Sequence, residues 1–228
     1  AKMANYESEY VRSMVAGNIN TPLDVLIKLA NDKESIVREA VAKNRNTPSK
    51  ALDKLSNDEE DCVRVAVAQN ENTPVGTLSY LAQDDNKWVR LFVIGNLNTS
   101  IETLKMIAKD SAITEEELAT LATNEVWEIR VCAAKSTKAS PELLSTLAKD
   151  KHWLTRTKIA KNCKTSADIL TMLAEDEDWY VREAVAMNPH TPLTTLAMLL
   201  KDADEQVSKA AIKALSKGKE KSKVNIGR

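Results

Sequence analysis

A repeat of twenty-six residues, the interval from Arg12 to Arg38, is the feature that most constrains how this chain folds. A Val-Arg pair, or a close variant, recurs at that interval in two series of four, but the interval between the two series, from Arg90 to Arg130, is longer. The arginine position holds, in order, Arg12, Arg38, Arg64, Arg90, Arg130, Arg156, Arg182 and Ser208. Such a period predicts one structural unit per repeat, stacked on its neighbours because a single unit cannot bury its apolar face. The longer interval predicts one truncated unit, at about residues 99–113.

Each full unit predicts two short helices. It reads TPxxxLxxLAxDxxxxVRxAVAxNxN, and its leucines, three apart, share one face of a first helix, α or 3₁₀. The valine and alanines around the arginine have the spacing of a second helix. We expect the repeated Thr to cap the first helix and the repeated Asp to cap the second. The repeated Asn would end the second helix in the left-handed conformation. Glu117 and Asp168, three residues after Thr114 and Thr165, predict capping boxes.

Composition supports an all-α fold. The chain has five glycines and 4% aromatic residues, which disfavours turn-rich β folds and glycine-loop nucleotide folds. We predict a single repeat domain over residues 1–217, with an N-terminal cap helix at about 5–17, followed by a flexible basic tail over 218–228. Residues 213–228 hold six basic residues and one acidic residue, while the whole chain has a net charge of -1. The body of the chain is therefore acidic, which disfavours binding to a phosphate backbone.

No pattern of reactive residues predicts catalysis. His152 and His190 lie far apart in the sequence and are interpreted as surface residues near helix starts, and Cys62, Cys132 and Cys163 form no metal-binding pair. We therefore expect no metal, no cofactor and no enzyme activity. The sequence has no long apolar stretch, so we expect a cytoplasmic monomer with reduced cysteines and no membrane contact.

The repeated unit resembles the variant leucine-rich repeat (LRV) family and, more loosely, HEAT repeats. The resemblance covers roughly residues 5 to 215 and implies a right-handed superhelix of about eight repeats, with alternating α- and 3₁₀-helices. In HEAT-like arrays, an Asp and an Arg six residues apart form a ladder between repeats. That spacing is kept here by Asp32/Arg38, Asp58/Arg64, Asp84/Arg90, Asp150/Arg156 and Asp176/Arg182. The cysteine cluster that holds an iron–sulfur centre in one LRV protein is missing, so the resemblance implies no redox role.

Two residue types mark a candidate site. Seven of the nine arginines occupy one position of the repeat, where an arginine can bridge Asp side chains and carbonyl groups of adjacent units. Tryptophan stands three residues before the arginine in three successive units, where the earlier units hold Ser35, Asp61 and Lys87. The candidate binding residues are Trp127, Trp153, Trp179, Arg130, Arg156 and Arg182. The tryptophans either cover the arginine stems through cation–π contacts or form a row that binds a partner.

The predicted function is non-catalytic binding of another protein or a peptide along an extended helical surface. The alternative is a DNA-binding or DNA-repair protein similar to the alkylpurine DNA glycosylases, which are built on HEAT-like repeats and carry Trp residues and a carboxylate in a basic groove. Glu128 and Asp178 lie near the tryptophans. The shorter repeat and the acidic body disfavour this alternative, so nucleic acid is not the expected partner.

Overall fold

The chain folds into helices alone. The computed structural model describes the backbone of residues 7–226 and the side chains of residues 7–216. Within that range there are sixteen α-helices, no strand and no 3₁₀-helix. Most of them alternate between a seven-residue helix, called helix A below, and a nine-residue helix, called helix B. The predicted all-α solenoid of two-helix repeats is therefore confirmed, and its short helices are α-helices.

The bounds of the helices follow the repeat. The A helices are α2 (Leu23–Leu29), α4 (Ser49–Leu55), α6 (Val75–Leu81), α11 (Pro141–Leu147), α13 (Ala167–Leu173) and α15 (Leu193–Leu199). The B helices are α1 (Glu9–Gly17), α3 (Ser35–Lys43), α5 (Asp61–Gln69), α7 (Lys87–Gly95), α10 (Trp127–Lys135), α12 (Trp153–Lys161) and α14 (Trp179–Met187). The remaining helices are α8 (Ile101–Lys109), α9 (Glu115–Ala122) and α16 (Glu205–Ile226). Helix α1 begins later than the cap helix expected from residue 5, and α16 continues through most of the segment expected to be a tail. Residues 1–6 and 227–228 lie outside the described residues.

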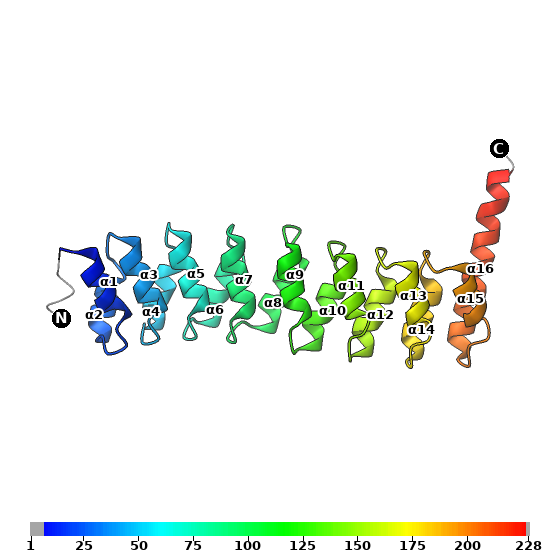
Figure 1. Cartoon of the computed structure of the whole chain (residues 1–228), viewed down its shortest axis with the longest axis horizontal. Helices are drawn as coiled ribbons and strands as arrows, with labels where there is room; N and C mark the ends of the chain where they lie inside the picture. Colours follow the sequence, from blue (N-terminus) through cyan, green and yellow to red (C-terminus); the bar gives the residue numbers. More distant parts are fainter. Residues whose placement is uncertain (1–6, 227–228) are drawn as a thin grey trace. The chain divides into compact units, whose positions relative to one another are not determined.

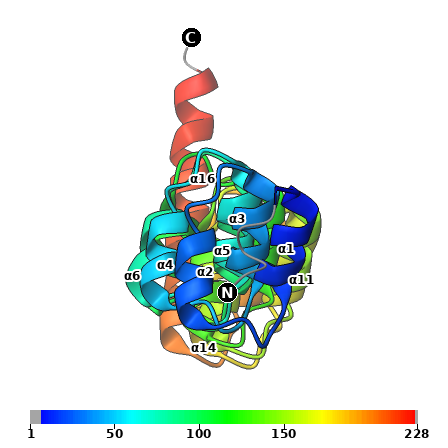
Figure 2. The ribbon, with the colours of Figure 1, turned by 90° about the vertical axis from the view of Figure 1, so that its left-hand side faces the viewer.

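The chain divides into two compact units, Ala1–Asp110 and Ser111–Arg228. In unit 1 each B helix packs on the next, α1 on α3, α3 on α5 and α5 on α7. Figure 2 shows α2, α4 and α6 as a second row beside these helices. In unit 2, α10, α12, α14 and α16 pack in the same succession, and the C-terminal part of α16 projects from the rest of that unit (Figure 1). No helix in residues 7–226 has both the length and the hydropathy needed to cross a membrane.

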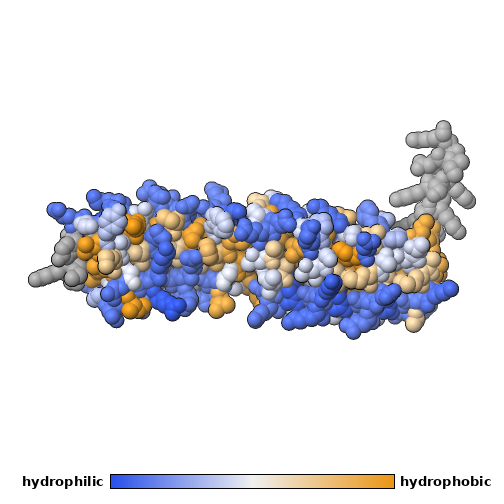
Figure 3. All heavy atoms as spheres, in the orientation of Figure 1, coloured by the Kyte–Doolittle hydropathy of each residue, from blue (hydrophilic) through white to orange (hydrophobic). Residues whose placement is uncertain are grey.

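The core of each unit lies between its two rows of helices. Leu52 and Leu55 of α4 are buried, as are Val63 and Val67 of α5, and the other repeats bury the equivalent residues. Each such side chain stabilises the fold by about 1.5–3 kcal/mol relative to an exposed position. Figure 3 shows that hydrophilic residues gather along the edges of each unit, with paler and apolar residues between them.

The repeated Thr bonds backwards instead of capping helix A. The Thr73 hydroxyl donates to the carbonyl oxygen of Val67, 2.6 Å away, and Pro74 is the cap residue of α6. Thr47 and Thr191 make the same contact with Val41 and Val185. The predicted Thr caps are therefore wrong at the Thr-Pro sites, because the hydroxyl instead binds the end of the preceding helix B. They are also wrong at Thr99 and Thr165, whose hydroxyls bond the carbonyl oxygens of Val93 and Ile159 in the same way.

Side-chain caps form at four A-helix starts that lack the Thr-Pro pair. Ser100, Thr114, Ser140 and Ser166 accept hydrogen bonds from backbone N–H groups in the first turn. The capping box predicted at Thr114 and Glu117 is confirmed, whereas Thr165 precedes the cap residue Ser166, so Asp168 does not complete a box.

The repeated Asn does not adopt the left-handed conformation that we predicted. Asn70 has φ -71° and ψ 126°, and no described residue has a positive φ. Its amide nitrogen Nδ2 donates to the carbonyl oxygens of Ala42 and Asn44 at 2.6 and 3.0 Å. Its Oδ1 accepts from the backbone N–H of Asn72. The same two donations to the preceding repeat are made by Asn44, Asn96, Asn162 and Asn188. We call these residues the asparagine ladder.

The truncated unit is a fusion of a helix A start with a helix B end. Helix α8 begins like a helix A, with Ser100 accepting from the N–H of Thr103. The residue that follows it, Asp110, is extended, with φ -63° and ψ 133°, like the residues that follow the B helices. The residues that follow the A helices are helical. The truncated unit predicted here could have lost helix B after a normal helix A. The structure instead retains both outer ends and lacks the turn between them.

Candidate functional site

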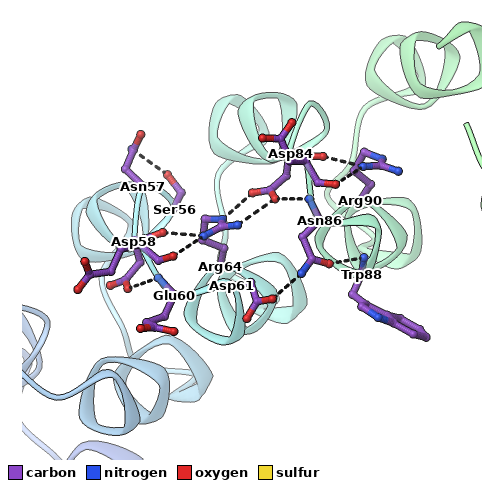
Figure 4. Close-up of polar contacts among 12 residues, drawn as sticks. Ser56, Asn57, Asp58, Glu60, Asp61, Arg64, Asp84, Asn86, Trp88 and Arg90 are labelled. Atoms are coloured by element: carbon purple, nitrogen blue, oxygen red, sulfur yellow. Dashed lines mark hydrogen bonds and ion pairs between the residues drawn. The ribbon is translucent and has the colours of Figure 1, made fainter. Parts of the chain in front are cut away.

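The repeated arginines bridge neighbouring repeats. Arg38 donates from Nε and Nη2 to the carboxylate of Asp58, at 2.6 and 2.8 Å, and from Nη1 to the carbonyl oxygens of Asp32 and Lys33. Figure 4 shows Arg64 in the same arrangement. The carboxylate partner thus lies twenty residues after the arginine, and the Asp six residues before it contributes only its carbonyl group. The paired residues are Arg12/Asp32, Arg38/Asp58, Arg64/Asp84, Arg130/Asp150, Arg156/Asp176 and Arg182/Asp202.

The ladder aspartates build the turn before helix B. Asp58 Oδ1 accepts from the backbone N–H of Glu60, and Glu60 is the cap residue of α5. The prediction that the repeated Asp itself caps helix B is therefore wrong by two residues. One Asp side chain holds this turn and binds the arginine of the preceding repeat, so the turn and the ladder depend on the same carboxylate.

The paired side chains of the ladder are buried, and their pKa values are shifted. Arg38 is 8% exposed, and the Asp58 side chain is 6% exposed. Burial on its own raises the pKa of Asp58, but the hydrogen bonds from Arg38 and from the Glu60 N–H outweigh it and lower the pKa. The bond to Asp58 raises the pKa of Arg38 despite burial. Both groups are therefore charged over the physiological range of pH.

The candidate arginines belong to this ladder. Arg130 and Arg156 are buried and Arg182 is half-buried, each against its carboxylate. In the described side chains, no cation–π contact joins these arginines to the candidate tryptophans. The tryptophans therefore do not form the arginine lids that were one of the two interpretations of the row.

The candidate tryptophans belong to a stack of five aromatic rings. The rings of Trp127 and His152 are parallel, 4.2 Å apart, and those of Trp153 and Tyr180 are 5.2 Å apart. His152 also stacks on Trp153 at 6.0 Å, and Trp179 on Tyr180 at 3.7 Å. We call these five residues the aromatic stack. It runs without interruption across the starts of α10, α12 and α14.

Helix capping positions the rings of the stack. His152 is the cap residue of α12, and its Nδ1 accepts from the N–H of Leu154. Asp178 caps α14 by accepting from the N–H of Tyr180. Trp153 is 38% exposed and Tyr180 45% exposed, whereas Trp127 and Trp179 are half-buried. The stack is therefore ordered by three helix starts and open to solvent in its middle.

Sequence reasoning missed two members of the stack. His152 was interpreted as an ordinary surface residue, and Tyr180 was not considered. The signal was present, because His152 precedes one tryptophan of the row directly and Tyr180 follows another. Residues on either side of a helix start can point to the same surface, which a comparison restricted to one repeat position cannot reveal.

The described residues contain no group of three His, Cys, Asp or Glu side chains placed to hold a metal ion. Cys62 and Cys132 are half-buried and Cys163 is exposed, all as free thiols. Burial, followed by the nearby charges of Glu39, Glu60 and Asp61, raises the pKa of Cys62.

Comparison with known proteins gives structural matches alone. No protein-family model matches the chain, and no curated protein matches it. One similar solved structure is a leucine-rich repeat variant with a novel repetitive motif, 25% identical, with 93% of this chain and 79% of that chain covered and a TM-score of 0.42. It carries the family description that the repeat pattern resembles.

Two designed armadillo repeat proteins are also similar, each 17% identical with 94% of this chain and 96% of theirs covered. Their TM-scores are 0.29 and 0.24, and the second was designed for modular peptide recognition. The helices and the ladders of this chain define its fold.

Proposed function

We propose that this protein is a non-catalytic repeat scaffold that binds another protein or a peptide through the aromatic stack. The observation that carries the proposal is the stack itself, which spans three repeats that would stack without it. The equivalent first positions of α3, α5 and α7 hold Ser35, Asp61 and Lys87, and those helices pack on one another in the same succession. Packing of the repeats therefore does not require an aromatic residue at this position.

The chemistry of the stack suits a protein partner. Tryptophan and tyrosine dominate binding energy at protein interfaces because they offer a large rigid area and lose little conformational freedom. The mutual stacking of the rings fixes them before a partner arrives, which reduces the entropy lost on binding. Trp153 and Tyr180, the exposed pair in the middle, are the expected anchors.

Nucleic acid is a poorer fit to the same surface. Base recognition by aromatic residues needs free ring faces and nearby cations. In the stack, Trp179 faces Tyr180 and Trp127 faces His152, and the neighbouring arginines are bound to aspartates. The acidic side chains of Glu128 and Asp178 adjoin the rings in sequence and would repel phosphate groups.

The test is a selection from a displayed library of random peptides on the intact protein. We expect enriched peptides to bind in solution and to lose about tenfold or more in affinity with Trp153→Ser, the loss typical of an aromatic anchor. Tyr80→Ser is the matched control, because Tyr80 is an exposed aromatic residue on helix A α6.

The melting temperature of both variants is measured on the same samples. If the stack serves binding, the Trp153→Ser variant has a melting temperature close to that of the wild type, because Ser35 occupies this position in α3. A large loss of melting temperature with undiminished peptide binding would show that the stack serves stability alone.

A further inference from the structure

A cluster of three lysines lies on the same helices as the aromatic stack. Lys158 and Lys161 are on α12, and Lys135 is on the neighbouring helix α10, which packs against it. Lys158 is half-buried, and Lys135 and Lys161 are exposed. Burial, and then the positive charges of Lys135 and Lys161, lower the pKa of Lys158. Within the described residues, no ion pair joins these three amino groups to a carboxylate. We call them the lysine cluster.

The cluster departs from the repeat pattern on α10 and α12, two of the three helices that carry the stack, whereas α14 holds Ala184 and Met187 at the positions of Lys158 and Lys161. The position of Lys158 holds Ala40, Ala66 and Phe92 in α3, α5 and α7. At the ninth position of the helix, Lys43 of α3 pairs with Glu39, and α5 and α7 end in uncharged residues. Two features that repeat packing does not require thus coincide on α10 and α12.

The register of helix B sets the distance between these two features. Trp153 and Lys161 are the first and last residues of α12, as Trp127 and Lys135 are of α10. With a rise of about 1.5 Å per residue, the Cα atoms of these first and last residues lie about 12 Å apart along each helix axis. An extended chain spans that distance with about four residues.

Three close positive charges without a counter-charge destabilise the free protein, and the partial burial of Lys158 adds to the effect. An anion at this place removes the repulsion, so binding there is favoured over any surface on which charges are already paired. The aromatic stack at the other end of the same helices favours an apolar or aromatic group on the same partner.

We propose that the partner is an acidic peptide segment, which places an apolar or aromatic side chain on Trp153 and Tyr180 and its carboxylates on the lysine cluster. This inference rests on the proposed function and adds the chemistry of the partner. A peptide can contact both the aromatic stack and the lysine cluster because its negative charge can be confined to one part of the segment. A nucleic acid carries a phosphate at every nucleotide, including beside Glu128 and Asp178.

The experiment is the same peptide selection, repeated on Lys158→Gln/Lys161→Gln. On the wild type we expect enriched peptides to carry an excess of Asp and Glu about four residues from an aromatic or apolar residue. On the double variant the acidic excess disappears, while the aromatic or apolar preference remains. Lys50→Gln/Lys109→Gln is the matched control, because both lysines are exposed and lie in unit 1.

The affinity of one enriched acidic peptide, measured in solution, gives the size of the contribution that the lysines make to binding. We expect the Lys158→Gln/Lys161→Gln variant to weaken binding by about fivefold or more, and added salt to reduce the difference between the two proteins. The control variant binds like the wild type.

Three results would overturn the inference. The first is a set of enriched peptides with no acidic excess, and the second is an excess that persists on the lysine variant. The third is an oligothymidine of about ten nucleotides that binds more tightly than the best acidic peptide. Peptides that depend on Trp153 but not on the lysines would leave the proposed function standing and refute only the acidic partner.

Discussion

Arg38 and Asp58 meet across a boundary between repeats where little water reaches them. The guanidinium group makes two bonds to the carboxylate and two to carbonyl groups of its own repeat. Removal of either partner leaves the other buried with unmet hydrogen bonds, at a cost of about 1–3 kcal/mol. Single residues therefore link one repeat to the next, and their protonation and pairing can be tested directly.

The contribution of the ladder to the stability of the protein depends on pH. Because the pKa of Asp58 is lower in the folded protein than in the unfolded chain, its contribution is present above the unfolded value, about 3.9, and is lost as pH falls through the folded value. We predict that Asp58→Asn reduces the stability lost between pH 7 and pH 3, measured by urea unfolding at each pH. An unchanged pH dependence would contradict the pairing.

A double-mutant cycle tests the register of the ladder. Arg64 binds the carboxylate of Asp84 and only the carbonyl group of Asp58. We predict a coupling of about 1–3 kcal/mol between Arg64→Ala and Asp84→Ala, and a smaller coupling between Arg64→Ala and Asp58→Ala. A larger coupling with Asp58 than with Asp84, measured by chemical unfolding, would favour the six-residue pairing expected from the sequence.

Thr155 stands where other repeats bury valine or isoleucine. It is fully buried, and its hydroxyl has no hydrogen-bond partner among the described residues. Burial on its own raises the pKa of Asp150. Hydrogen bonds from Arg130 and from the His152 N–H, with the smallest contribution from Thr155, outweigh burial and lower the pKa. We predict that Thr155→Val raises the free energy of unfolding by about 1 kcal/mol, because valine removes an unpaired polar group without changing the shape. A lower melting temperature would contradict the unpaired state of the hydroxyl and would show that it stabilises the charged form of Asp150.

Within each repeat, the ends of the helices take part in contacts that stabilise the fold. The end of helix B exposes carbonyl groups that the Asn and Thr side chains satisfy, the Asn from the following repeat and the Thr from the following turn. Helices of seven and nine residues are too short to be stable alone. Their stability therefore comes from these end contacts and from the buried leucines and valines.

Substitution of Asn70 separates the two interpretations of the repeated asparagine. If Asn70 were in the left-handed conformation, Asn70→Gly would reduce the free energy of unfolding only slightly. The asparagine ladder instead predicts that Asn70→Gly destabilises at least as much as Asn70→Ala, by about 2 kcal/mol or more, because the carbonyl groups of Ala42 and Asn44 lose their donor. Chemical unfolding of both variants gives the comparison, and a stable glycine variant would refute the ladder's role.

At the scale of the whole molecule, the array of repeats divides at Asp110 and Ser111. Helix α8, which precedes the division, lacks the turn and the ladder arginine that a full repeat supplies. The structure thus places the irregular unit of the sequence at the boundary of its two compact units. A single domain over residues 1–217 stays a prediction.

We predict that α8 and α9 are the least protected helices in hydrogen exchange. A complete repeat supplies a ladder arginine and two packed helices, whereas the fused unit has no ladder arginine and a single helix. Exchange measured by mass spectrometry should be faster in α8 and α9 than in α5, which lies between two complete repeats. Equal protection of the three helices would contradict this expectation.

The sequence predicted the repeat, its two helices and the tryptophan row, because each depends on local spacing. It did not predict the partner of Arg64 or the role of Asn70, because those contacts join residues twenty or more positions apart. His152 was missed for a similar reason: its ring stacks on Trp127 of the previous repeat. The lysine cluster was missed because Lys135 and Lys158 are neighbours only once α10 and α12 pack together.

The two ladders give the array a direction. In unit 1, Arg12, Arg38 and Arg64 each bond the aspartate of the next repeat, and Asn44, Asn70 and Asn96 each bond carbonyl groups of the previous repeat. The complete repeats of this unit therefore offer the same donors on one side and the same acceptors on the other. A duplicated block of one repeat length, inserted within unit 1, would meet matching partners at both joints. The chain can therefore lengthen or shorten by whole blocks during evolution or in the laboratory, while a block of another length would leave buried groups unmatched unless, as in α8, it kept both outer ends.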